Sequence, residues 1–416
     1  MPLLASSSLF IVQRMTKLAA VFSLLGAVGY LYARGQIGKY PLAALSIMTL
    51  MLGLGALIGI LAKENAAVIF LFILAVEVTL RGRPKRISRA VWRTWFTIVL
   101  VAPLLLLLGY LAIALPYPED TVLRRGFTGA ERLLTEAEIL WKYLLLAFVP
   151  NIQSLGPFHD DYVVRRSLLH PAVLISMTAW LLAIIAAVRL RKRAPLFSFA
   201  VAWYLLGHML ESTTLNLELY FEHRNYLPLI GPIYALVASV AQLPAKWHRL
   251  ASVAGVSYAA LLGVILFSTT SLWGSPRMAA EVWYKNNPNS LRAIVHLAGQ
   301  LEETEPPYVV RRVLEQYLGV HPDQHSIRIA ALLVSCQLEP RSDHASTMEA
   351  LESGLKTAGH SYSILAGFQQ LYGLSRDGNC PEIRRDAIYR LGQSLLENPQ
   401  FNASIVRHNI HAVLAS

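Results

Sequence analysis

The densest group of side chains able to do chemistry lies between residues 211 and 228, in the stretch ESTTLNLELYFEHRNYLP. Five ionisable residues fall within it, although only 15% of the chain is charged. They are Glu211, Glu218, Glu222, His223 and Arg224. Charge next to hydrocarbon costs free energy, so a cluster of it between apolar segments favours a binding or catalytic role. The alternative is a polar loop whose side chains only solvate it.

Arg224 carries a planar fork of N–H donors that matches the oxygen atoms of a phosphate. Glu222 and His223 precede it directly, and they could orient the fork or move a proton. The stretch therefore predicts a phosphate-binding site with a neighbouring acid–base pair.

A second charged pair, Lys63 and Glu64, interrupts the apolar run from Pro41 to Leu80. This run is about twice the ~20 residues that one span needs. We therefore expect a tight hairpin that turns at Lys63, Glu64 and Asn65. One long helix with a buried ion pair is the alternative. The pair could bind a ligand, or its lysine could simply extend to water from the turn.

A third group, His159, Asp160 and Asp161, follows a glycine and a proline in the stretch GPFHDDY. A histidine beside two aspartates could bind a divalent metal, supply a base or receive an acceptor. The alternative is a solvated turn, which we prefer for these three residues taken alone. The metal requirement therefore stays open.

The elements that must position these groups are mostly apolar. The chain of 416 residues is 55% hydrophobic, whereas soluble domains are nearer 45–50%. We predict an all-α polytopic membrane bundle of about eight spans over residues 1–272. The apolar segments are Lys17–Ala33, Pro41–Ala62, Ala66–Leu80, Trp95–Leu115, Pro171–Val188, Pro195–Leu210, Pro228–Ala241 and Leu250–Leu272.

Basic residues set the orientation of the predicted bundle. The net charge is +11, and much of the excess falls in Arg81–Arg93 and Arg189–Arg193. The positive-inside rule places such loops in the cytoplasm, so the charge does not indicate nucleic-acid binding. The Lys63 turn, the loop over residues 116–170, the stretch 211–228 and the C-terminal part then lie outside. In a bacterium this side is the periplasm, and the protein is a multi-pass inner-membrane protein.

The external loop over residues 116–170 is too long to be a simple connection. Residues 131–149, ERLLTEAEILWKYLLLAFV, carry apolar side chains at helical spacing. They predict an amphipathic helix that lies on the membrane surface.

Residues 276–416 change to the periodic, amphipathic pattern of soluble helices. Pro288 and Pro322 lie in similar stretches 34 residues apart, which is the period of tetratricopeptide (TPR) repeats. We predict a helical-repeat, TPR-like domain in the periplasm, a type that usually binds extended partners. The only cysteines, Cys336 and Cys380, allow one disulfide, and their spacing does not decide whether it forms.

The N-terminus has no basic residues before its apolar run and is a poor signal peptide. We expect further spans upstream of it.

Four stretches in this order resemble a known family: FIVQRMT at residues 10–16, AKENAAVIFLFILAVE at 62–77, GPFHDD at 156–161 and FEHRNYLP at 221–228. Together with the helical repeats they resemble the bacterial relatives of the transmembrane-and-tetratricopeptide (TMTC-like) glycosyltransferases. The resemblance runs from about residue 10 into the repeats. It implies a C-type membrane enzyme that moves a sugar from a polyprenyl-phosphate donor to a protein or glycan acceptor.

The resemblance also implies roles for individual residues. Arg224 and Lys63 would bind the donor phosphate. The family's catalytic carboxylate lies in an acidic motif of the first external loop, which this sequence does not contain, so no catalytic residue is assigned. The residues expected to support the site are Glu64, Glu211, Glu222 and His223, and Gln13 and Arg14 are expected on the same face.

Two other classes of function compete with the enzyme. A non-catalytic membrane scaffold would use its repeats to recruit an envelope protein. A transporter of lipid-linked glycans would bury charge in the middle of its spans, whereas the charge here gathers at one face.

Overall fold

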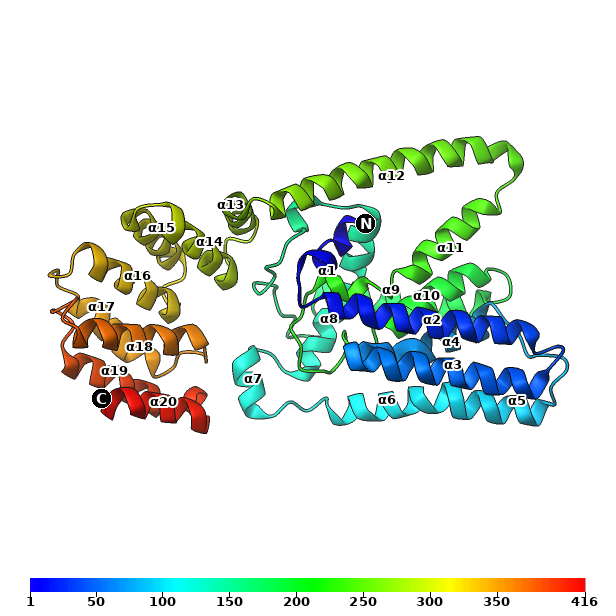
Figure 1. Ribbon diagram of the computed structural model, residues 1–416, viewed down its shortest axis with the longest axis horizontal. Helices are drawn as coiled ribbons and strands as arrows, with labels where there is room; N and C mark the ends of the chain where they lie inside the picture. The colour runs from blue at the N-terminus through cyan, green and yellow to red at the C-terminus, as the bar shows by residue number, and fades with distance from the viewer. Residues whose placement is uncertain (416) are drawn as a thin grey trace. The chain divides into compact units, whose positions relative to one another are not determined.

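The structure, a computed structural model, describes residues 1–415 except for the side chains of Asp120, Leu123 and Arg124. The chain is helical throughout, with no β-strand within residues 1–415, so the all-α prediction is confirmed (Figure 1). It divides into two compact units. The first comprises Met1–Tyr117 and Phe127–Gly274, and the second comprises Pro118–Gly126 and Ser275–Ser416.

The first unit contains most of the apolar helices. They are α1 (Ser6–Leu9), α2 (Arg14–Gln36), α3 (Pro41–Ala62), α4 (Ile69–Thr79), α5 (Arg89–Phe96), α6 (Ala102–Ile113), α8 (Gly129–Phe148), α9 (Pro171–Leu190), α10 (Pro195–Gly207), α11 (Ile230–Ala241) and α12 (Ala245–Trp273). The short turns are η1 (Pro2–Leu4), η2 (Glu64–Val68), η4 (Ile152–Ser154) and η5 (Glu222–Asn225), and a π-helical turn, η3 (Thr97–Val101), joins α5 to α6. Prolines open α3, α9 and α10, where the missing N–H is not needed.

Five helices are long and apolar enough to cross a membrane: α2, α3, the continuous α5–α6 over Arg89–Ile113, α9 and α12. The other predicted segments form the shorter apolar helices α4, α10 and α11. Apolar side chains cover the exposed surface of α12, among them Val256, Leu261 and Phe267. These features are those of a multi-pass membrane protein.

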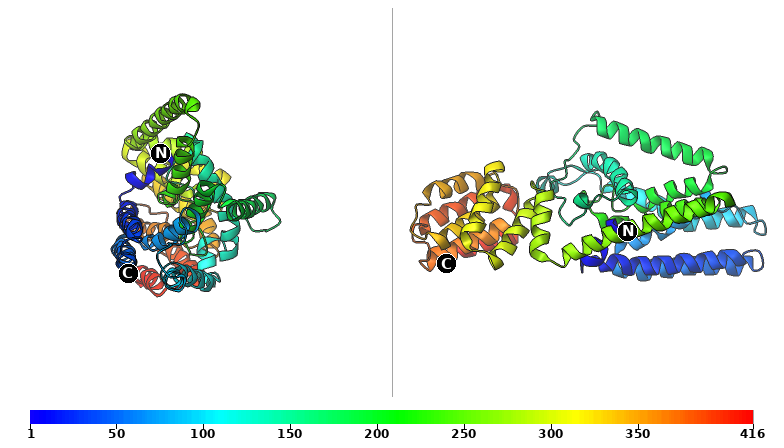
Figure 2. Two further views of the ribbon diagram at one scale, coloured as in Figure 1. Left: turned by 90° about the vertical axis from the view of Figure 1, so that its right-hand side faces the viewer. Right: turned by 90° about the horizontal axis from the view of Figure 1, so that it is seen from above.

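Glycines let α2 and α3 pack closely, and the two helices lie side by side in every view (Figure 2). A Cβ atom on Gly26 would come within 2.8 Å of the Met51 carbonyl oxygen, and one on Gly55 within 2.9 Å of Gly26 Cα. Small residues at such contacts bring two backbones together, which is how helices associate where no water is expelled.

The apolar run from Pro41 to Leu80 is broken where the sequence predicted it. Helix α3 ends at Ala62, Lys63 takes an extended conformation, and the chain resumes as η2 and then α4. A single long helix is therefore excluded. Lys63 is the residue that directly follows the last turn of α3.

The arginine-rich runs gather at the opposite end of α3. Arg86 donates to the Gly38 carbonyl oxygen at 2.8 Å, and Arg34 donates to the Gly82 carbonyl oxygen at 2.7 Å. Arg191 lines the same groove as Thr79, at the end of α4. The two basic runs predicted for one side therefore share one end of the first unit.

The second unit is built from amphipathic helices. They are α7 (Glu119–Arg125), α13 (Pro276–Asn286), α14 (Leu291–Thr304), α15 (Pro307–Val320), α16 (His325–Leu338), α17 (Ala345–Leu355), α18 (Tyr362–Arg376), α19 (Arg385–Glu397), the turn η6 (Pro399–Phe401) and α20 (Ser404–Ala415). Eight helices, α13 to α20, thus occupy the segment after residue 275 in which the sequence shows an amphipathic pattern. Helices α14 and α16 begin at residues 291 and 325 and end at 304 and 338, so both bounds are offset by 34.

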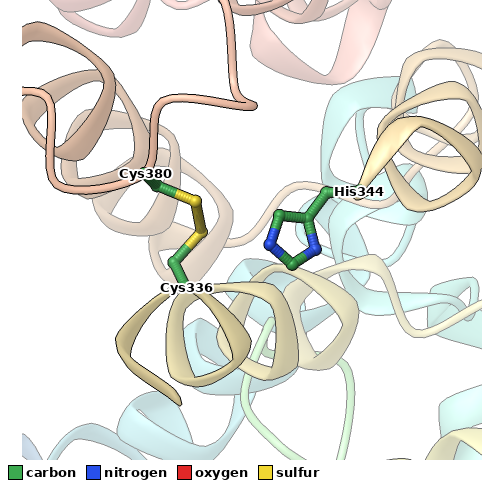
Figure 3. A group of neighbouring side chains, drawn as sticks. All are labelled: Cys336, His344 and Cys380. Atoms are coloured by element: carbon green, nitrogen blue, oxygen red, sulfur yellow. A yellow bond between two sulfur atoms is a disulfide. The ribbon is translucent and has the colours of Figure 1, made fainter. Parts of the chain in front are cut away.

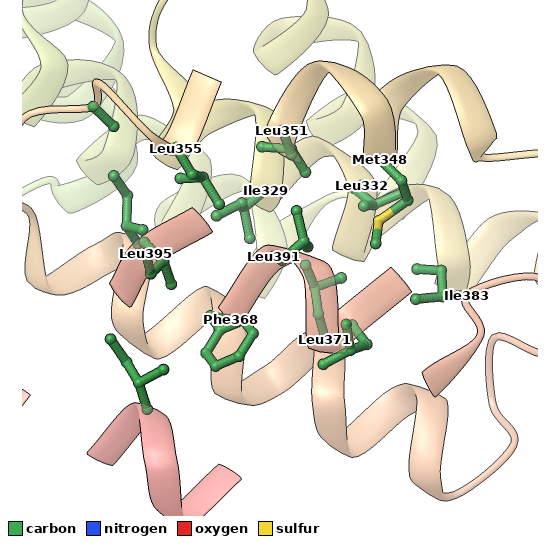
Figure 4. Packing of buried hydrophobic residues seen from close by; sticks show 14 of the residues in the cluster. Ile329, Leu332, Met348, Leu351, Leu355, Phe368, Leu371, Ile383, Leu391 and Leu395 are labelled. Atoms are coloured by element: carbon green, nitrogen blue, oxygen red, sulfur yellow. The ribbon is translucent and has the colours of Figure 1, made fainter. Parts of the chain in front are cut away.

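Buried apolar side chains fill the space between these helices. Leu332, Leu351, Phe368, Leu371 and Leu391 meet in one core (Figure 4). Cys336 and Cys380 lie in the same core and form a disulfide, with their Cα atoms 5.5 Å apart. The pairing that the sequence left open is thus present.

Candidate functional site

Ionisable side chains from distant segments of the first unit meet in one group, called here the polar cluster. It draws on the break after α3, on α8 and on the loop between α10 and α11. All of its members are buried: Lys63, Asn65, Arg132, Glu136, His208, Glu211, Ser212, Glu222, His223 and Arg224. Buried charge is stable only where it is paired and hydrogen-bonded, so each contact in the cluster has to be accounted for.

Lys63 is paired with Glu211. Its Nζ atom lies 2.5 Å from Glu211 Oε1 and 3.3 Å from Thr16 Oγ1, and Asn65 Nδ2 lies 3.5 Å from Glu211 Oε2. Of the two carboxylates expected to support Lys63, Glu211 forms the ion pair, whereas Glu64 is exposed. Lys63 has an extended backbone after the end of α3, and Glu64 begins the 3-10 turn η2.

Arg132 fastens the loop that begins at Glu211. Its guanidinium donates to the carbonyl oxygens of Thr213 at 2.8 Å, Glu218 at 3.0 Å and Glu211 at 2.9 Å, and also to that of Leu217. It donates a further hydrogen bond to Glu136 Oε1 at 2.8 Å. All five N–H donors of this fully buried arginine are therefore in use.

Arg224 is occupied in the same way. Its terminal nitrogens donate to the carbonyl oxygens of Leu219 at 2.8 Å and Glu218 at 2.5 Å, and one lies 3.4 Å from Glu136 Oε1. The fork that the sequence predicts for a phosphate thus binds the loop's own backbone. In this structure Arg224 stabilises the backbone conformation of the loop by these hydrogen bonds.

Glu136 is the carboxylate between the two arginines. Its Oε1 atom accepts from both, whereas its Oε2 atom is buried without a hydrogen-bond partner among residues 1–415. Burial raises the pKa of Glu136, and the positive charges of Arg132 and Arg224 oppose that rise. A buried carboxylate oxygen without a donor is costly and marks a place where a ligand proton could bind.

An apolar groove of about 320 Å³ leads to Glu136 and Ser212. Its walls come from α8 and from the candidate span α9. The apolar residues that line it are Leu133, Ala137, Leu140, Met177, Trp180, Leu181 and Ile184. The groove therefore connects a membrane-type helix surface with the polar cluster.

Glu222 and His159 are brought together although 63 residues separate them, since 222 − 159 = 63. His159 Nε2 lies 3.6 Å from Glu222 Oε1, which also accepts from the Gly156 N–H at 3.1 Å. Burial raises the pKa of Glu222, and His159 and the Gly156 N–H lower it. Two predicted candidates, the FEHRN and GPFHDD motifs, thus form one contact.

The metal interpretation of His159, Asp160 and Asp161 finds no matching cluster. Over the described part of the chain, the one group of three such side chains close enough to share an ion consists of Cys336, His344 and Cys380. The pKa of Asp161 is raised by burial and by neighbouring Asp160. His159 is directed at Glu222 instead.

His223 is a further buried member of the cluster, and its imidazole lies beside the Phe221 ring, with the ring centroids 5.1 Å apart. Burial, together with the positive charges of Lys63 and Arg224, lowers its pKa to about 3. The ring is therefore neutral at pH 7 and has one nitrogen that donates and one that accepts. Such a ring can donate a hydrogen bond to an anionic ligand, or donate and accept hydrogen bonds with an uncharged polar ligand.

The sequence analysis missed Arg132 and Glu136. They are spaced i,i+4 in residues 131–149, where an arginine–glutamate pair is usually a surface feature. The signal that could have found them is their place on the apolar side of an amphipathic helix, with Thr135, Ile139 and Tyr143 on the same buried face.

Comparisons with known proteins did not show which family this chain belongs to. A scan against models of known protein families gave no match, and searches of curated proteins and of solved structures found no similar chain.

Proposed function

We propose that the first unit is a membrane glycosyltransferase that transfers a sugar from a polyprenyl-phosphate donor to a protein or glycan acceptor. The observation that carries the proposal is the convergence of Lys63, Glu211 and His223 in one buried cluster at one end of the apolar helices. Lys63 and His223 come from two of the stretches that resemble the TMTC-like family, whereas Glu211 lies outside them. The reaction takes place at the external face of the bacterial inner membrane.

Lys63 supplies the charge that binds the donor phosphate. Its ammonium group has three donors, and Glu211 and Thr16 accept two of them. A phosphate oxygen can take the third without breaking the ion pair. Arg224 positions the loop by binding its carbonyl oxygens, and His223 offers a neutral imidazole to a phosphate or sugar hydroxyl.

The groove between α8 and α9 suits the prenyl chain of the donor. It is lined almost entirely by apolar side chains and ends at polar atoms of Glu136 and Ser212. A prenyl chain in the membrane is already surrounded by hydrocarbon, so packing contacts with the apolar walls would hold it in the groove. Such a groove would hold the lipid while its head group reaches the polar cluster.

The second candidate function is a non-catalytic scaffold that recruits an envelope protein. The observation that favours it is a groove of about 680 Å³ in the second unit, lined by residues of α14, α15, α16 and α18. Helical arrays commonly bind extended segments along such surfaces.

Substitution of Lys63 tests the enzyme proposal. In membranes supplied with a polyprenyl-phosphate sugar, Lys63→Ala should lower sugar transfer by at least the ~100-fold typical of one lost electrostatic stabiliser. Photo-cross-linking of a polyprenyl-phosphate probe should fall with it, which measures donor binding separately from turnover. Lys63→Arg should retain part of both, because it keeps the charge.

The matched control is Lys39→Ala, which removes an exposed lysine from the other end of α3. This variant should transfer sugar and bind the probe as the unmodified chain does. Equal probe binding by Lys63→Ala and Lys39→Ala would remove Lys63 from the donor site. Absence of probe binding by the unmodified chain would favour the scaffold.

A further inference from the structure

A second cluster of chemically capable side chains lies wholly within the second unit. Cys336 comes from α16, His344 precedes α17, and Cys380 lies in the turn between α18 and α19. Their side chains point toward one another from three directions (Figure 3). The ligand atoms of the three residues lie within 4.8 Å of one another, and all three residues are buried.

His344 has a buried ring nitrogen whose lack of a hydrogen-bond partner is not explained by the disulfide. Its side chain is 7% exposed, and its Nε2 atom is buried without a hydrogen-bond partner among the described residues. A buried imidazole nitrogen usually has a partner, because its desolvation is otherwise uncompensated. Here it lies beside two sulfur atoms in an apolar core that includes Met348 and Ile383.

We propose that Cys336, Cys380 and His344 form a Zn²⁺ site when the disulfide is reduced. Two thiolates and one imidazole are a ligand set found for zinc, with a water molecule in the fourth position. Zn–S bonds of about 2.3 Å in a tetrahedron place two sulfur atoms roughly 3.8 Å apart. The two sulfurs therefore need to separate only by a small rotation of side chains that already face one another.

The reaction that opens the site is thiol–disulfide exchange. A dithiol reductant gives two electrons and two protons to the Cys336–Cys380 bond and becomes a disulfide itself. Zn²⁺ then replaces the two thiol protons, and these are released to the solvent. The neutral Nε2 atom of His344 supplies the third bond. The pair of cysteines thus has two exclusive states, a disulfide and a metal site.

Cobalt binding by the full chain in detergent tests the proposal. The chain is reduced with a dithiol, the reductant is removed under argon, and Co²⁺ is added as a spectroscopic substitute for Zn²⁺. The reduced chain should bind one Co²⁺ with the absorption of a tetrahedral thiolate complex, and Zn²⁺ should displace it. The oxidised chain should give no such absorption.

Two variants separate a metal site from adventitious binding. His344→Ala should weaken Co²⁺ binding at least tenfold, since it removes one ligand, whereas His325→Ala, at a half-buried histidine of the same unit, should leave it unchanged. The proposal is overturned if the oxidised and reduced chains bind alike, or if His344→Ala binds as tightly as the unmodified chain. Loss of helical circular dichroism on reduction, before any metal is added, would overturn it too.

Discussion

Two buried arginines, Arg132 and Arg224, hold the loop after α10 by its own carbonyl oxygens. Together they donate to the carbonyl oxygens of Glu211, Thr213, Leu217, Glu218 and Leu219. Glu136 lies between them and balances part of their charge. The charged residues of this region therefore build the shape of the site as well as its electrostatics.

Arg132→Ala should destabilise the first unit strongly. Removing one partner of a buried ion pair costs about 3–5 kcal/mol, and without Arg132 the Glu136 carboxylate would keep only its 3.4 Å contact with Arg224. Arg277→Ala is the matched control, since Arg277 and Glu281 form an i,i+4 pair of the same 2.8 Å length whose side chains are 33% and 53% exposed. Such exposed pairs contribute about 0–1 kcal/mol. Thermal unfolding in detergent measures both, and similar shifts in the two variants would contradict this role of Arg132.

His223 should make the stability of the first unit depend on pH. The folded state holds its pKa at about 3, against an ordinary value of 6.5. Below pH 6.5 the unfolded chain takes up a proton that the folded state does not, so stability falls as the pH falls toward 3. Between pH 6.5 and 5 the loss is about 2 kcal/mol, at 1.36 kcal/mol for each unit.

The comparison that checks this uses two histidines. In His223→Gln the melting temperature should change less between pH 6.5 and 5 than in the unmodified chain. His248→Gln, at an exposed histidine, should behave as the unmodified chain does. A pH dependence that survives in His223→Gln would assign it to other groups.

At the scale of the elements, the close approach of α2 and α3 depends on glycine at particular positions. Gly55→Leu should cost about 1–3 kcal/mol, because the added side chain meets the backbone of α2. Gly53→Leu, two residues away on the same helix, should be tolerated because a Cβ atom there meets nothing within 4 Å. The amount of folded protein extracted from membranes compares the two. Equal yields would show that this interface does not limit folding.

The periodicity of apolar residues predicted where the helices lie better than it predicted which side chains contact one another. The eight helices after residue 275 and the break at Lys63 follow from local patterns of apolar residues, proline and charge. The pairing of Lys63 with Glu211 spans 148 residues and depends on how α3 packs. Spacing carries no information about such a contact, so the sequence did not show which of the supporting carboxylates pairs with Lys63.

At the scale of the whole molecule, the first unit has two chemically different ends. The arginine-rich runs lie at one end and the polar cluster lies at the other. Arg86 and Gly38 mark one end, and Lys63 with Glu211 marks the other. The positive-inside rule predicts a cytoplasmic signal from a reporter fused at Gly82 and a periplasmic signal from one fused after Ala415. A periplasmic signal at Gly82 would reverse the orientation, and the proposed site would then face the cytoplasm.

The four hydrogen bonds that Arg132 donates to carbonyl oxygens of the loop reduce its conformational entropy before any ligand binds. Fixing the backbone of one residue costs about 1–2 kcal/mol, and in the segment from Glu211 to Glu218 this cost is met when the chain folds. A ligand that binds beside Lys63 would meet a loop already ordered, so little of its binding energy is lost to ordering. Protease cleavage in this segment should accordingly be slow without ligand and should change little when a polyprenyl phosphate is added.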